Sequence, residues 1–119
     1  VKEQFTKLGS ALTAAATITP THQAHTLTLP AGAVSIDVIS ATGAAPGQLF
    51  VLTAAGAGSG PVSIRSTSHS SNITTGKNIK CGGADDSVIN FDGAYDSAVF
   101  LFDGTNWIAV SSFSGGPNQ

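Results

Sequence analysis

Short runs of apolar and β-branched residues, separated at close intervals by Gly, Pro, Ser and Asn, make up most of residues 11–113. Such punctuation is typical of strands, because helices need longer stretches with a period of 3.6 residues. The pattern predicts an all-β fold, a compact β-sandwich or barrel-like domain of about nine short antiparallel strands. The predicted strands cover residues 26–29, 34–38, 48–53, 62–65, 72–74, 78–80, 88–91, 98–102 and 107–111.

These strands differ in how apolar residues are spaced along them. Residues 26–29 and 34–38 alternate with a period of two, which indicates one buried face and one face left for water or a subunit. Residues 48–53 form a continuous apolar run after Ala45-Pro46-Gly47. Runs of that kind are typical of strands covered on both faces, so we expect this segment to be the central strand.

Charged residues are scarce. Asp, Glu, Lys and Arg make up 10% of the 119 residues, against about 25% in an average soluble domain. The net charge is −2 and no basic cluster occurs, so nucleic-acid binding is not expected. Mean hydropathy is +0.20 without an apolar run of about 18 residues, which favours subunit contacts over membrane insertion. The single cysteine, Cys81, excludes an intrachain disulfide.

The even composition predicts one domain with two flanking segments. We expect residues 1–10 to be an N-terminal extension or anchoring segment and residues 11–113 to be a single all-β domain. Residues 114–119 are rich in Gly, Pro and Asn and predict a flexible C-terminal tail.

One hairpin is predicted directly. Asp103-Gly104 lies between two apolar runs, and this dipeptide can take the positive φ values of tight turns. The hairpin should consist of Phe102, Asp103, Gly104 and Trp107, with Trp107 packed on Phe100 or Phe102.

Metal-ligand candidates are weak. His22 and His25 are three residues apart and would face opposite sides of a strand, although one histidine from each of three chains could form an axial site. Asp85 and Asp86 belong to an acidic C-terminal third that could suit calcium, but Asp in turns more often bonds its own backbone. We expect no metal and no cofactor.

Catalysis is not indicated either. His69 lies among serines, but the sequence has no strand-to-helix elbow and no glycine-rich oxyanion loop beside it, so we expect no enzyme. Tyr95 is a candidate ligand contact, because an exposed aromatic ring can stack on a sugar. Trp107 is more typical of a core residue.

The order of several phrases over residues 30–112 resembles a module of bacteriophage virion proteins, found in tail fibres, tail spikes and capsid-attached fibres. The closing Asp-Gly-x-x-Trp hairpin is its most specific part, and Ala109 departs from the acidic residue often found after the tryptophan. The phrases are Gly47-Gln48-Leu49-Phe50-Val51-Leu52, Pro61-Val62-Ser63-Ile64-Arg65, Asn72-Ile73, Asn78-Ile79 and Val99-Phe100-Leu101-Phe102-Asp103-Gly104-Thr105-Asn106-Trp107.

The resemblance implies a trimeric structural subunit on the virion that contacts itself, other virion proteins and the host surface. The alternative is a carbohydrate-binding β-sandwich module, which would be monomeric with Tyr95 or Trp107 exposed. A fibre or capsid subunit would instead be oligomeric with Trp107 buried. Loops 54–60, 66–71 and 82–87 are the expected places of ligand contact.

Overall fold

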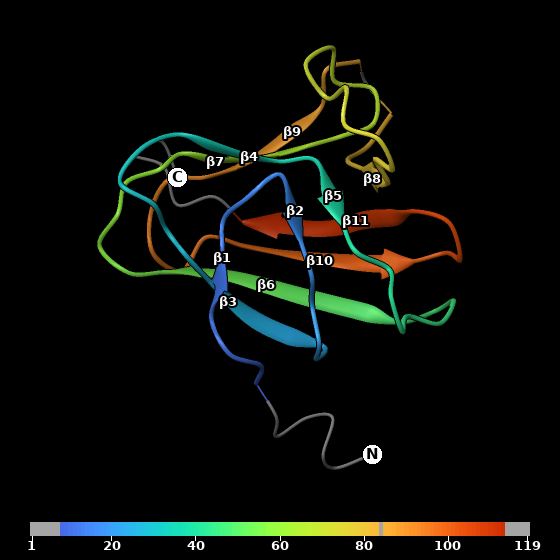
Figure 1. Ribbon diagram of the computed structural model, residues 1–119, viewed down its shortest axis with the longest axis horizontal. Coiled ribbons are helices and arrows are strands. Elements are labelled where there is room, and N and C mark those ends of the chain that lie inside the picture. Colours follow the sequence, from blue (N-terminus) through green and yellow to red (C-terminus); the bar gives the residue numbers. More distant parts are fainter. Residues whose placement is uncertain (1–7, 84, 114–119) are drawn as a thin grey trace.

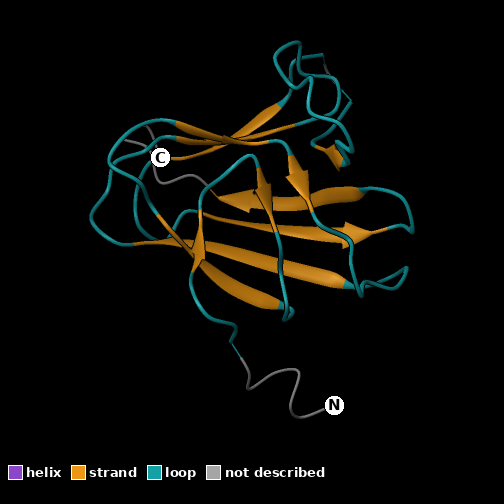
Figure 2. Ribbon diagram, in the orientation of Figure 1, coloured by secondary structure: helices purple, strands orange, loops and turns teal. Residues whose placement is uncertain are grey.

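The structure, a computed structural model, describes residues 8–83 and 85–113. Within these residues the chain forms eleven short strands and no helix, which confirms the all-β prediction (Figure 2). Residues 1–7 of the expected N-terminal segment 1–10 and the expected tail 114–119 lie outside the described residues. The strands are β1 (Leu12–Thr13), β2 (Thr17–Ile18), β3 (Ala24–Thr28), β4 (Val34–Ile36), β5 (Val38–Ile39), β6 (Leu49–Ala55), β7 (Val62–Arg65), β8 (Ile79–Lys80), β9 (Val88–Phe91), β10 (Ser97–Phe102) and β11 (Trp107–Phe113).

The strands form three sheets. A six-stranded sheet has the order β1-β3-β6-β10-β11-β8, a three-stranded sheet has the order β4-β7-β9, and β2 pairs with β5. Figure 1 places the six-stranded sheet on one side of the molecule and the three-stranded sheet on the other. The chain passes from the six-stranded to the three-stranded sheet at β3–β4, β6–β7 and β8–β9. It returns from β4 through β5 to β6, at β7–β8 and at β9–β10.

The prediction of antiparallel strands is wrong for most pairings. Five pairings are parallel (β1–β3, β3–β6, β4–β7, β2–β5 and β8–β11), and three are antiparallel. The reason is the crossing between sheets, because a strand that is reached after a full circuit runs in the same direction as the strand beside it. This gives part of the chain a stacked, solenoid-like course.

The predicted set of strands needs two further corrections. Residues 72–74 are not a strand, because the Asn72 side chain binds backbone carbonyls and Ile73 is 86% exposed. The two-residue strands β1 and β2 were not expected, since two residues are too few to show a period.

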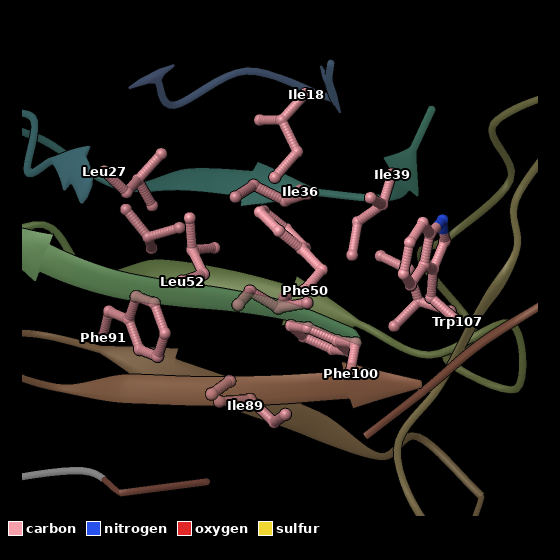
Figure 3. Close-up of a cluster of buried hydrophobic side chains, with 14 of the residues drawn as sticks. Ile18, Leu27, Ile36, Ile39, Phe50, Leu52, Ile89, Phe91, Phe100 and Trp107 are labelled. Carbon is pink, nitrogen blue, oxygen red and sulfur yellow. The ribbon is translucent and has the colours of Figure 1, made fainter. Parts of the chain in front are cut away.

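The core lies between the six-stranded and three-stranded sheets. Figure 3 shows its aromatic part, where the Phe50 ring stacks on Phe100 at a centroid distance of 6.2 Å and meets Trp107 edge-on at 5.9 Å. From the opposite sheet, Ile64 and Phe91 are fully buried. Burial of such side chains is the main favourable contribution to folding of a chain this size.

β6 is central in its sheet, between β3 and β10, but it is not covered on both faces as its sequence predicts. Phe50, Leu52 and Ala54 are buried, whereas the alternate residues are half-buried or exposed. The second face of this apolar strand points away from the core.

Candidate functional site

The predicted hairpin is present. β10 and β11 pair through Phe102 and Trp107, and the loop of residues 103–106 joins them. Gly104 has φ 104°, whereas Asp103 does not take a positive φ as a tight two-residue turn would require. Its carboxylate accepts hydrogen bonds from the backbone N–H groups of Thr105 (2.8 Å) and Asn106 (2.7 Å), which lower the pKa of Asp103. The loop is therefore held by an Asp side chain.

Trp107 is 1% exposed and packs on Phe102 at a ring-centroid distance of 4.9 Å, as predicted. The ring also meets Phe50 edge-on at a centroid distance of 5.9 Å. Trp107 is therefore a core residue and does not offer a surface on which a sugar ring could stack.

The two histidines do not form a metal pair. His25 is buried, and its Nε2 accepts hydrogen bonds from the backbone N–H groups of Thr21 (2.9 Å) and His22 (3.1 Å). Its Nδ1 therefore carries the hydrogen and donates it to the Ser10 carbonyl at 2.8 Å. Both ring nitrogens are used, so His25 cannot be a ligand at an axial site. His22 is exposed and contacts the Thr21 hydroxyl through Nδ1.

The acidic candidates lie in the loop between β8 and β9. Asp85 and Asp86 are both exposed, and Asp86 has φ 58°. The Asp86 carboxylate accepts a hydrogen bond from the Ser70 backbone N–H at 2.6 Å, which lowers the pKa of Asp86. Its role is to join loop 82–87 to loop 66–71. Among the described residues no group of three or more His, Cys, Asp or Glu side chains could hold a metal ion.

Tyr95 lies at the corner between β9 and β10, where it is 85% exposed and has φ 74°. The buried Asp96 carboxylate fixes this corner by accepting hydrogen bonds from the N–H groups of Asp92 (2.9 Å) and Gly93 (3.2 Å). The Tyr95 N–H donates to the Ala54 carbonyl at 2.9 Å. A bulky residue with positive φ is strained, and its ring gains little packing here.

One polar cluster was missed by the sequence analysis. Arg65 on β7 forms a bidentate ion pair with Asp37, with Nε–Oδ1 2.6 Å and Nη2–Oδ2 2.8 Å. The Thr74 hydroxyl donates to the same carboxylate at 2.8 Å, and the Asn72 amide binds the carbonyls of Asp37 and Arg65. Arg65 lowers the pKa of Asp37. The sequence does contain a signal for this cluster, because Asp37 and Arg65 are each the only charged residue in an apolar segment predicted to be a strand.

The free cysteine is not a reactive group. Burial raises the pKa of Cys81 to about 11, so the thiol stays protonated near neutral pH. Cys81 lines an open groove between the first residues of β9 and residues 109–112 of β11.

The candidate interaction surface is the outer face of the six-stranded sheet. We define it by the apolar residues of β6, β10 and β11 that point away from the core. Val51 lies opposite Val99, Leu49 opposite Leu101, and Leu101 opposite Ile108. The strands β3, β6, β10 and β11 contain no charged residue. The residues of the outer face are Leu49, Val51, Val99, Leu101 and Ile108.

The outer face continues along β11 beyond the end of β8. β8 pairs with β11 only at Trp107 and Ile108, so residues 109–113 have no described strand on that side. Phe113 is 71% exposed there and lies opposite Ser97. An edge without charge or proline is open to pairing with another chain.

Comparison with protein-family models, curated proteins and solved structures finds no match to this chain. Within residues 8–83 and 85–113 there is no helix long and apolar enough to cross a membrane.

Proposed function

We propose that this chain is a structural subunit of a bacteriophage virion, a fibre, spike or capsid-attached protein that assembles with copies of itself through the outer face. The single observation that carries the proposal is the combination of an apolar central strand, β6, with cover on only one of its sides. A sequence of this type is expected in strands covered on both faces. A second copy would supply the missing cover.

The distribution of charge supports the same surface. In the six-stranded sheet the only charged residue is Lys80 on the edge strand β8. The ion pair of Asp37 and Arg65, together with Lys77 and Asp86, lies in or beside the loops of residues 66–87. Burying unpaired charge in an interface is costly, so a face without charge is suited to assembly, while the charged loops are suited to solvent.

The phage setting and the symmetry come from the resemblance of residues 30–112 to virion modules. In this proposal the two facing sheets are those of a β-sandwich, three copies form a trimer, other virion proteins are further partners, and the protein is located on the virion. Stability then depends on assembly, because association removes the outer faces from water. Burial of Trp107 is what a fibre or capsid subunit requires.

A detergent gel tests the proposal. The purified chain, loaded without heating in sodium dodecyl sulfate, should run as an oligomer and should convert to the monomer band on boiling. Phage fibres and spikes must survive outside the cell, so an oligomer that resists detergent is expected. A monomer band in unheated samples at every protein concentration would contradict a fibre or spike role.

A carbohydrate-binding role is the second candidate, and one observation favours it. Tyr95 is a strained and exposed aromatic residue, and strained backbone occurs where a function retains it. Its ring could stack on a sugar of the host surface. On a glycan array the chain should then bind a defined set of glycans, and Tyr95→Ala should remove that binding while the oligomer persists.

A further inference from the structure

A small polar cavity lies at the opposite end of β6 from Tyr95. Tyr95 bonds Ala54 near the end of β6, whereas the cavity lies beside Gln48, which precedes the first residue of that strand. The cavity volume is about 130 Å³, and several of its lining residues are exposed, so it is accessible from solvent. Its polar and aromatic lining includes Thr21, His22, Ser40, Thr42, Gln48 and Trp107.

The Trp107 indole is the unusual member of this lining. Its Nε1–H is buried and has no acceptor within the described residues. Buried donors in native proteins nearly always have a partner, so an orphan donor needs an explanation. In Figure 3 the nitrogen lies on the side of the ring away from Phe100, at the margin of the core cluster. The unpaired donor thus lies at the border between the apolar cluster and the cavity that Trp107 lines.

Hydrogen bonds among the other polar groups of the lining use only part of their donor and acceptor capacity. The Thr21 hydroxyl contacts His22 Nδ1 at 2.9 Å, and the Ser40 hydroxyl donates to Thr42 Oγ1 at 3.2 Å. Gln48 Oε1 accepts from the Ala45 N–H at 3.3 Å, which leaves the two amide hydrogens of Gln48 to donate. The cavity thus offers several hydrogen-bond donors around one space.

The lining also lacks formal charge, since none of its described residues is Asp, Glu, Lys or Arg. A carboxylate or phosphate would have no fixed counter-charge there, whereas hydroxyl oxygens can both accept from the donors and donate to Ser40 and Thr42. The cavity, at about 130 Å³, is slightly smaller than the roughly 150 Å³ that admits benzene, so it has room for a small polyol or for one edge of a single sugar ring whose remainder lies in solvent.

We propose that this cavity binds a single neutral polyhydroxylated group, a terminal sugar residue or a free polyol, with one ligand oxygen accepting the hydrogen bond of Trp107 Nε1–H. Gln48 donates to a second oxygen of the same group. The site is independent of assembly through the outer face and of any sugar contact at Tyr95.

The chain has one tryptophan, so a nitrogen–proton correlation spectrum of the full chain contains one indole N–H resonance that reports on this site. The probes are methyl glycosides of glucose, galactose and mannose, with glycerol as the free polyol. The expected result is a saturable shift of the indole resonance with at least one probe. Saturation by glycosides alone identifies a terminal sugar, and saturation by glycerol alone identifies a free polyol.

Two variants separate this site from others. Gln48→Ala should weaken binding about tenfold, the effect of losing one good hydrogen bond. Tyr95→Ala, altered at the other end of β6, should leave the indole shift unchanged, whatever it does on a glycan array. An indole resonance that no probe moves would mean that the cavity holds water only and would overturn the proposal. Equal binding by wild type and Gln48→Ala would overturn it as well.

Discussion

Val51 on β6 and Val99 on β10 are direct cross-strand partners at the middle of the outer face. Val51 is in turn paired with Ala24 on β3, and Val99 with Ser111 on β11. An uncharged row therefore crosses four strands. Both valines are half-buried by their neighbours in the sheet, and a second sheet or a second subunit would be needed to bury them completely.

The ion pair of Arg65 with Asp37 should be a main contribution to stability. The Asp37 side chain is 4% exposed, so Arg65→Ala leaves a buried carboxylate without its cation. We expect the free energy of unfolding in urea to fall by about 3 kcal/mol. Lys80→Ala is the matched control, because Lys80 is exposed, and it should change stability by no more than about 0.5 kcal/mol. Equal effects of the two substitutions would contradict this role of Arg65.

The same pair gives stability a defined pH dependence. Arg65 lowers the pKa of Asp37 below its ordinary value of 3.8, so the stabilisation is present above that pH and is lost as the pH falls toward the lowered pKa. The difference in unfolding free energy between wild type and Asp37→Asn should therefore shrink below pH 3.8. A difference that stays constant down to about pH 2 would show that the carboxylate charge does not act here.

Gly9 should tolerate no side chain. A Cβ atom at Gly9 would overlap the buried His25 ring, which is held by hydrogen bonds at both nitrogens. Gly9→Ala should destabilise the protein by about 1–3 kcal/mol in urea unfolding. At Gly32 the same Cβ would meet nothing within 4 Å, so Gly32→Ala should be neutral or stabilising by up to about 1 kcal/mol. Equal loss at both positions would contradict the packing of Gly9 on His25.

The strained backbone of Tyr95 should lower the free energy of unfolding of the protein. Because its φ is 74° and its side chain is exposed, Tyr95→Gly should raise the free energy of unfolding by about 1 kcal/mol. Tyr95→Ala keeps the strained φ and should give no such gain. If glycine destabilises as much as alanine does, the ring must contribute packing that outweighs the strain.

Local patterns in the sequence are enough to predict part of this fold. The hairpin at Asp103-Gly104 and the burial of Trp107 follow from turn chemistry and from aromatic packing on Phe102. The parallel pairing of β3 with β6 could not be predicted, because it depends on the intervening crossing to β4 in the other sheet. The spacing of apolar residues predicts that a segment is a strand, but it does not predict which strand pairs with it.

In the candidate sites, too, some properties follow from the local sequence, whereas others depend on contacts that only the folded chain makes. The ring nitrogens of His25 bind the backbone at Ser10 and Thr21, and these contacts need the folded chain. Asp37 and Arg65 are 28 residues apart in sequence, so their pairing also depends on the fold. By contrast, Tyr95 is exposed, which agrees with its place in a turn-rich segment and with its prediction as a ligand contact.

The most direct test of assembly through the outer face is the mass of the protein in solution, measured by light scattering on a sizing column. Wild type should have three times the 11.9 kDa chain mass. Val51→Lys should have the single-chain mass, because a charge then lies at the centre of the face, and Thr75→Lys in an exposed turn should keep the wild-type mass. Both variants should unfold in urea with folded baselines like that of wild type. A wild-type chain that is monomeric at all concentrations, or a Val51→Lys variant that assembles as well as wild type, would contradict the account.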